Sequence, residues 1–132
     1  MNPGRRGMRR GRRRRRMMGF LQPCMLLILH RGDAHGYNLL NGLGEFGLNP
    51  KAYDPSIVYR ALREMETPGW VISYEGAESQ GPRRRVYRLT EEGQRHLKIW
   101  IEDLRRVKRE VELLIQAYER DVKPQMGDKD DA

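Results

Sequence analysis

Two apolar segments predict the first pair of helices. Residues 25–29 form an almost unbroken apolar run, which is typical of a helix buried on most sides, and we expect this helix to span residues 21–30. A second helix is expected from residue 34 or 35 to residue 46, because apolar residues at positions 39, 40, 43 and 46 share one helical face. Asp33 is its expected N-cap, and residues 47–53 are expected to form a turn.

A third helix has the clearest start signal in the chain. Asp54 stands at the N-cap position, Pro55 at the first helical position, and Pro68 and Gly69 end the helix. Apolar residues at positions 58, 61, 62 and 65 follow the i, i+3, i+4, i+7 spacing and predict a buried face. The opposite, polar face carries Ser56, Tyr59, Arg60, Arg63 and Thr67.

Alternation of apolar and polar residues predicts two strands, over residues 71–75 and 84–89. The loop between them, residues 76–82, is polar except for Ala77, and we call it the wing. Three consecutive arginines, Arg83, Arg84 and Arg85, lead into the second strand. Arg88 has two interpretations, one as a further wing cation and one as a member of an intramolecular ion pair.

The last helix is predicted to begin after Thr90 as its N-cap and to end at Pro124, leaving residues 123–132 as a flexible acidic tail. Residues 91–122 carry apolar positions at alternating spacings of three and four, which predicts packing against another helix. We expect that helix to be the same one in a second subunit, the alternative being that it folds back over the first helix. The heptad positions are Leu97, Trp100, Leu104, Val107, Val111, Leu114 and Tyr118.

Charge is distributed unevenly along the 132 residues, which are enough for one domain. Residues 1–19 contain nine arginines and no acidic residue, whereas the other residues hold 17 Lys and Arg against 18 Asp and Glu. The net charge of +8 therefore belongs to an N-terminal arm, which we expect to be disordered. Such an arm suits nucleic acid or anionic lipid, and the alternative is a solubilising leader with no dedicated role.

The sequence offers no support for enzymatic chemistry. The three histidines, His30, His35 and His96, have no partners at metal-ligand spacing, and there is no glycine-rich phosphate loop or nucleophile elbow. We therefore expect no catalytic residue, no metal and no cofactor. Cys24 lies in an apolar run and is expected in the core, with a sensing thiol as the alternative.

The arginine run followed by apolar residues is similar to the start of a signal peptide, but Gln22 and Pro23 interrupt the apolar part and no small-residue cleavage site follows. The apolar run is also too short to cross a bilayer. We expect a soluble, cytoplasmic protein without a membrane partner.

A helix followed by a basic hairpin predicts a winged helix-turn-helix over residues 20–90, so the expected fold is mainly α with a small β-hairpin wing and a long C-terminal dimerisation helix. The exposed face of the third helix would contact base edges and phosphates in a major groove. The arginines beside the wing would lie against the DNA backbone or minor groove, unless they are ordinary strand-edge charges. Lys51 and the amide end of the second helix are secondary phosphate candidates.

Three segments carry a resemblance to the PadR family of bacterial transcriptional regulators. They are HGYNLL at residues 35–40, SIVYRALREME with the following PGW at residues 56–70, and PRRRVYRLTEEG at residues 82–93. The resemblance implies a homodimer that binds palindromic operators in double-stranded DNA, represses transcription, and often releases DNA when a small-molecule effector binds. Ile57 and Val58 depart from the usual start of the family's third helix, and the arginine arm is not part of the family pattern.

Carried over by position, the third helix reads bases with Ser56, Tyr59, Arg60 and Arg63, and the wing arginines clamp the flanks. His35 and Tyr37 stand in the family's His-Gly-Tyr signature, where they are either structural or phosphate-facing. The single long terminal helix resembles the family's short subgroup, whose ligands can sit at the dimer interface. Trp100 would then line a ligand pocket or, alternatively, belong to the dimer core.

Two other functions stay open from the sequence. The arginine arm also suits a non-specific nucleic-acid architectural or RNA-binding module. A protein-interaction adaptor could retain the fold without binding DNA, but it has no evident need for three arginines beside the wing.

Overall fold

The computed structural model describes residues 20–76 and 84–130, with side chains up to residue 122. The chain forms two compact units, Met1–Lys98 and Ile99–Ala132. A first helix covers residues 20–31. The elements that follow are strand β1 (Ala34–His35), helix α2 (Gly36–Gly42), 3-10 helices at Leu43–Phe46 and Pro50–Ala52, helix α3 (Ser56–Glu66), strands β2 (Val71–Glu75) and β3 (Arg85–Leu89), and helix α4 (Glu91–Asp130).

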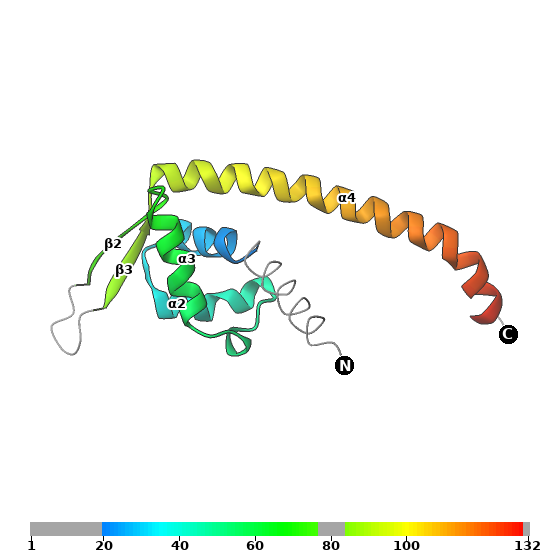
Figure 1. Cartoon of the computed structure of the whole chain (residues 1–132), viewed down its shortest axis with the longest axis horizontal. Coiled ribbons are helices and arrows are strands. Elements are labelled where there is room, and N and C mark those ends of the chain that lie inside the picture. The colour runs from blue at the N-terminus through cyan, green and yellow to red at the C-terminus, as the bar shows by residue number, and fades with distance from the viewer. Residues whose placement is uncertain (1–19, 77–83, 131–132) are drawn as a thin grey trace, which may run out of the picture. The chain divides into compact units, whose positions relative to one another are not determined.

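The core of the first unit is built from the faces that the apolar spacing predicts. The first helix, α2 and α3 each contribute buried side chains, and β2, β3 and the start of α4 close the core. Because α3, labelled in Figure 1, buries its apolar residues in this core, its polar face is left outward. The buried apolar residues are Leu21, Met25, Leu26, Leu29, Leu39, Leu40, Leu43, Val58, Ala61, Leu62, Met65, Val71, Tyr87 and Leu97.

The start of the second helix differs from its prediction. Asp33 is not the N-cap: α2 begins at Gly36, and His35 occupies the N-cap position in extended conformation without a side-chain capping bond. The Asp33 carboxylate instead accepts hydrogen bonds from the Tyr74 hydroxyl and the Arg88 guanidinium. Hydrogen bonds between a guanidinium and a carboxylate are charge-assisted and are stronger than a bond from a backbone amide. The α-helix also ends early, at Gly42, and residues up to Phe46 continue as a 3-10 helix, because Gly42 and Gly44 favour helix poorly.

The start and end of α3 follow the sequence signals closely. The helix begins at Ser56, one residue after the predicted Pro55, so Pro55 and not Asp54 occupies the N-cap position; the Asp54 carboxylate still accepts the Ser56 N–H at 3.0 Å. Hydrogen bonding from Ser56, first from its backbone N–H and then from its side chain, lowers the pKa of the Asp54 carboxyl. The chain leaves α3 through Gly69, whose φ of 81° lies in the left-handed region that glycine adopts readily.

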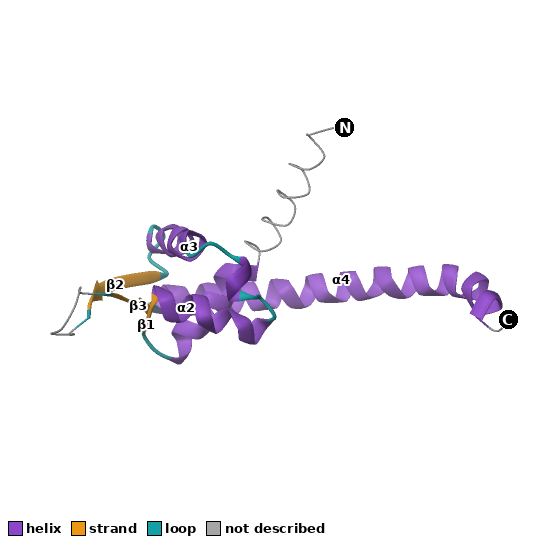
Figure 2. Ribbon diagram, turned by 90° about the horizontal axis from the view of Figure 1, so that it is seen from below, coloured by secondary structure: helices purple, strands orange, loops and turns teal. Residues whose placement is uncertain are grey.

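The sheet has three antiparallel strands in the order β1-β3-β2 (Figure 2). The sequence predicts β2 and β3, with β3 beginning one residue later than expected, but it misses β1. This strand has only two residues, too few for an alternating pattern, and it exists because His35 pairs with Val86 on β3. Residues 77–83, which hold nearly all of the wing, lie outside the described residues.

Helix α4 starts as predicted and ends later than predicted. The Thr90 hydroxyl accepts the Gly93 N–H at 3.0 Å, which confirms the N-cap. The expected end at Pro124 is wrong, because the helix continues to Asp130. A proline removes one intrahelical hydrogen bond, and the turns on either side can still propagate the helix.

Candidate nucleic-acid interface

The polar face of α3 is exposed along its length. Ser56, Tyr59, Arg60 and Arg63 are all exposed, and Tyr59 retains 42% of its accessible surface. These four residues therefore stand on one outward helical face, as their spacing predicts. Hydroxyl and guanidinium groups on one helical face can bond both base edges and phosphates.

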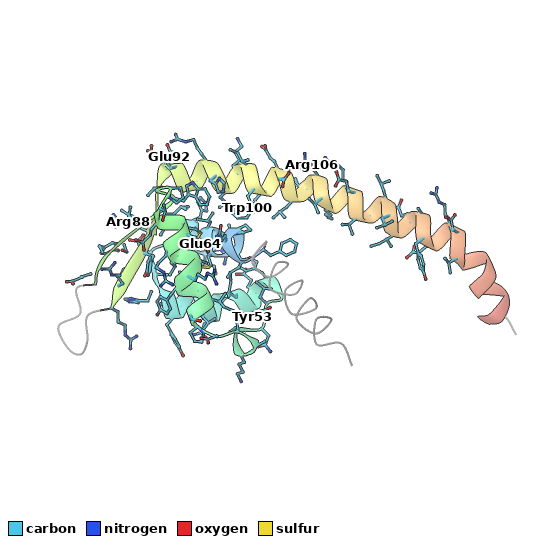
Figure 3. The ribbon with its side chains drawn as sticks, viewed as in Figure 1. Tyr53, Glu64, Arg88, Glu92, Trp100 and Arg106 are labelled. Carbon is cyan, nitrogen blue, oxygen red and sulfur yellow. The ribbon has the colours of Figure 1, made fainter. Side chains whose placement is uncertain are left out.

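The two arginines of α3 have different surroundings. Arg60 Nε lies 3.6 Å from Glu64 Oε1 one turn along the helix, and Glu64 also accepts a hydrogen bond from Gln22 at 2.9 Å. Figure 3 labels Glu64 on α3. The Arg63 guanidinium has no ion-pair partner among the described residues. Arg63 can thus bind a ligand without first breaking an internal ion pair.

A concavity of about 520 Å³ lies beside this face. We call it the His35 concavity, and it is lined by His35, Gly36, Tyr37, Tyr59, Arg84 and Arg85. Gly36 lies against the Tyr59 ring where α2 meets α3, and a Cβ on it would lie only 2.7 Å from Tyr59 Cε1, so the ring would have to shift. The tertiary structure therefore brings together the His-Gly-Tyr signature, α3 and the two arginines at the start of β3, Arg84 and Arg85.

Contacts at the rim orient two members of the concavity. His35 Nδ1 lies 3.2 Å from the carbonyl oxygen of Arg85. The Arg85 guanidinium donates to Ser73 Oγ at 3.2 Å, so this side chain is held against β2. Arg84 is exposed and precedes the first residue of β3.

A second polar cluster links the segment before β1 to strands β2 and β3, which flank the wing in the sequence. Asp33 Oδ2 accepts the Tyr74 hydroxyl at 2.5 Å and two Arg88 nitrogens, Nε and one Nη, each at 3.0 Å. Arg88, on β3 (Figure 3), also lies over the Tyr74 ring at 5.1 Å from its centroid. The Arg88 guanidinium, followed by the Tyr74 hydroxyl, lowers the pKa of the Asp33 carboxyl. Of the two interpretations of Arg88, the intramolecular ion pair is confirmed.

The remaining residues predicted to contact DNA are not among those that line the His35 concavity. Lys51 is exposed in the 3-10 helix Pro50–Ala52 and does not line the concavity. Arg83 lies outside the described residues. Within the described segments, no group of three His, Cys, Asp or Glu side chains could hold a metal ion. No helix among those residues has the length and apolar character needed to cross a membrane.

The sequence profile of the Transcriptional regulator PadR-like family matches residues 25–99, more than half of the chain. The chain belongs to the PadR-like family. The match begins in the first helix and ends in α4, so it includes both α3 and the His35 concavity. A comparison with proteins of curated function found no match.

Solved structures of PadR proteins share the fold. A PadR family transcription regulator from Clostridium difficile is 27% identical with a TM-score of 0.64, covering 73% of this chain and 98% of that one. A PadR-like regulator from Bacillus cereus is 26% identical with a TM-score of 0.64, covering 76% and 95%. Bacillus subtilis PadR, solved in complex with operator DNA, is 21% identical with a TM-score of 0.55, covering 62% and 46%. The winged-helix fold with a long C-terminal helix is therefore that of this family.

Proposed function

We propose that this PadR-like protein is a homodimeric, sequence-specific DNA-binding repressor. The observation that carries the proposal is the exposed face of α3, with Arg60 and Arg63, next to a concavity lined by two further arginines. An outward helix beside a basic hairpin is the arrangement with which winged-helix proteins enter a major groove and hold its flanks. Bacillus subtilis PadR was crystallised with operator DNA, which supports the same ligand here.

Within this proposal, the two arginines of α3 have different roles. Arg63, which has no internal ion pair, makes the bidentate contact with a guanine edge. Arg60 shares its charge with Glu64 and serves mainly to position the helix on the phosphates. Specificity would then rest chiefly on Arg63, and affinity on the sum of the phosphate contacts.

The proposed dimer rests on the second unit. Val107, Val111, Leu114 and Tyr118 are exposed there, Leu114 at 72%, although each stands at an apolar heptad position. Such a stripe on a long helix is stabilised when a second helix covers it. Leu97, the first residue of the series, is already buried within its own chain at 8% exposure, so the dimer contact would begin beyond it.

A small-molecule effector would act through the same dimer. Trp100 is half-buried on α4, and an indole offers a flat apolar surface for an aromatic ligand. Ligand binding there would release DNA by changing the spacing of the two α3 helices. Trp100 fluorescence, separated from that of Trp70 by Trp70→Phe, would report such binding directly.

The proposal is tested by fluorescence anisotropy with duplexes from the protein's own upstream promoter and with scrambled duplexes, across a salt series. We expect strong preference for the promoter. A variant lacking residues 2–16 should bind both duplexes more weakly by a similar factor, with a flatter dependence of log K on log salt, because the arm contributes phosphate neutralisation. Preference for the promoter should survive this deletion.

The second candidate is a non-specific nucleic-acid-binding protein, and the nine arginines of residues 1–19 are what favours it. Equal affinity for promoter and scrambled duplexes, lost on deletion of residues 2–16, would support this candidate and refute the sequence-specific one. A loss confined to promoter binding would instead mean that the arm reads a minor groove.

A further inference from the structure

We propose that Glu64 is a specificity-determining residue of the DNA-binding surface, and that its carboxylate accepts a hydrogen bond from the N4 amino group of a cytosine in the major groove. This inference rests on the proposed function and deepens it, because it assigns one base to a side chain that the polar face predicted from the sequence does not include. Glu64 has a fixed place on α3, and the contacts that fix it leave part of the carboxylate able to accept a further hydrogen bond.

Glu64 belongs to the outward surface of α3. Residues four apart on a helix form a ridge along its surface, and Ser56, Arg60 and Glu64 form one such ridge. The neighbouring ridge contains Tyr59 and Arg63. The side chain of Glu64 is 42% exposed. A helix that enters the major groove with these two ridges therefore brings a carboxylate beside the base edges.

Two contacts hold the Glu64 side chain in place. Its Oε2 accepts a hydrogen bond at 2.9 Å from Nε2 of Gln22, which lies on the first helix. Its Oε1 lies 3.6 Å from Arg60 Nε, which is longer than an ordinary N–H···O hydrogen bond. A side chain that is already fixed by a hydrogen bond to a second helix loses little freedom when it binds a base, so the contact is pre-organised.

The same contacts leave the carboxylate with acceptor capacity. An ionised carboxylate can accept about four hydrogen bonds, and Gln22 occupies one of these positions. Among the described residues, the hydrogen-bond and ion-pair partners of Glu64 are Gln22 and Arg60. Oε1 can therefore accept a hydrogen bond from a base, while the positive charge of Arg60 beside it limits the repulsion between the carboxylate and the DNA phosphates.

Cytosine is the base that suits a carboxylate in this position. In the major groove cytosine presents the N4 amino donor, whereas guanine presents two acceptors and thymine presents an acceptor and a methyl group. Adenine presents an amino donor beside the N7 acceptor, which would repel a carboxylate. A duplex without cytosine opposite Glu64 leaves a negative charge facing acceptors, and this disfavours binding. Glu64 therefore contributes to specificity by rejecting other bases as well as by binding one.

The test measures the preferred base at each position of the promoter site, by fluorescence anisotropy with a complete set of single-substituted promoter duplexes. For the wild-type protein we expect one position in each half-site where replacing cytosine by any other base weakens binding roughly tenfold through loss of the Glu64 contact. Glu64→Gln should move the preference at this position to adenine, because a glutamine amide can bond both N6 and N7 of adenine. Preferences at the other positions should not change.

Glu92→Gln is the matched control. Glu92 lies in the first turn of α4 and, like Glu64, forms an exposed ion pair with an arginine of its own helix, so this variant removes the same charge at a different place (Figure 3). It should leave every base preference unchanged. Because exposed ion pairs contribute little to stability, circular dichroism and urea denaturation should show both variants folded like the wild type.

Gln22→Ala tests the positioning of Glu64 without changing any charge. It removes the hydrogen bond that fixes the carboxylate, so discrimination in favour of cytosine should decrease at the position that responds to Glu64→Gln. No preference for adenine should appear there. Full discrimination in Gln22→Ala would overturn the pre-organised contact.

The outcomes separate this inference from the function on which it rests. Promoter preference with the same base preferences in the wild type and Glu64→Gln overturns the assignment of Glu64 and leaves the proposed function standing. So does a responding position at which the wild type prefers a base other than cytosine, or an equal change in Glu92→Gln, which would assign the effect to net charge. Failure of the wild-type protein to prefer the promoter over scrambled duplex refutes the proposed function itself.

Discussion

Replacing Gly93 by alanine should destabilise the protein, although helix propensity alone predicts the opposite. Gly93 lies in the first turn of α4, where alanine is favoured over glycine by roughly 0.5–1 kcal/mol. A Cβ at this position would lie 2.2 Å from the carbonyl oxygen of Trp70 and 2.5 Å from Leu89 Cδ1. Real Cβ atoms essentially never approach another heavy atom closer than 3.0 Å, so the backbone of Trp70 must move.

That movement would disturb the contacts that join Trp70, which follows α3, to the start of α4. The Trp70 carbonyl accepts hydrogen bonds from the Thr90 N–H at 3.0 Å and the Thr90 hydroxyl at 3.1 Å, and the Trp70 ring stacks on His96 with centroids 3.6 Å apart. Overpacking costs about 1–3 kcal/mol, and weakening one hydrogen bond about 0.5–1.5 kcal/mol. After the gain in helix propensity, we expect a net loss in the free energy of unfolding of roughly 2 kcal/mol, or about 8 °C in Tm.

Urea denaturation at fixed protein concentration, followed by circular dichroism and tryptophan fluorescence, measures this loss. The matched control is Gly32→Ala, because nothing lies within 4 Å of a Cβ there, and this variant should be unchanged or slightly more stable. A Gly93→Ala protein as stable as the wild type would refute the reasoning. It would mean that the contact between α4 and Trp70 is looser than the structure shows.

Three further predictions concern DNA reading, pH and assembly. Arg63→Ala should cost ~1–3 kcal/mol of DNA-binding free energy and relax specificity at one base pair, as measured by anisotropy with single-substituted duplexes; unchanged discrimination would remove Arg63 from base readout. Because the folded-state pKa of Asp33 is depressed, its stabilising contribution is fully present above the unfolded value of about 3.9 and is lost as pH falls through the folded value. Asp33→Asn should therefore be less stable than the wild type at neutral pH, with the difference shrinking in thermal melts below about pH 4; a constant difference would contradict the ion pair with Arg88. Val111→Glu should raise the dimer dissociation constant at least about tenfold in sedimentation equilibrium, since it would bury a charge, whereas Gln116→Glu, off the heptad stripe, should not; equal dimerisation of both variants would exclude α4 as the interface.

Much of the fold follows from the sequence alone, for local reasons. The buried face of α3 follows from helical spacing, its start from Asp54 and Pro55, and its end from Pro68 and Gly69. The strands β2 and β3 follow from alternation, and the cap at Thr90 from its hydroxyl. All of these signals act within a few residues of the chain, so no knowledge of distant contacts is needed to use them.

The tertiary structure decided what depends on residues far apart in the chain. Asp33 is a residue type that commonly caps helices, yet its carboxylate accepts hydrogen bonds from Tyr74 and Arg88. It does so because the pairing of β1 with β3 places Asp33 beside the sheet. The packing of Gly36 against Tyr59 and the gathering of His35 with Arg84 and Arg85 follow from the same assembly. The sequence thus determined which residues face outward and carry charge. Only packing of the three helices against the sheet determined which of them meet, because no local pattern records contacts between distant segments.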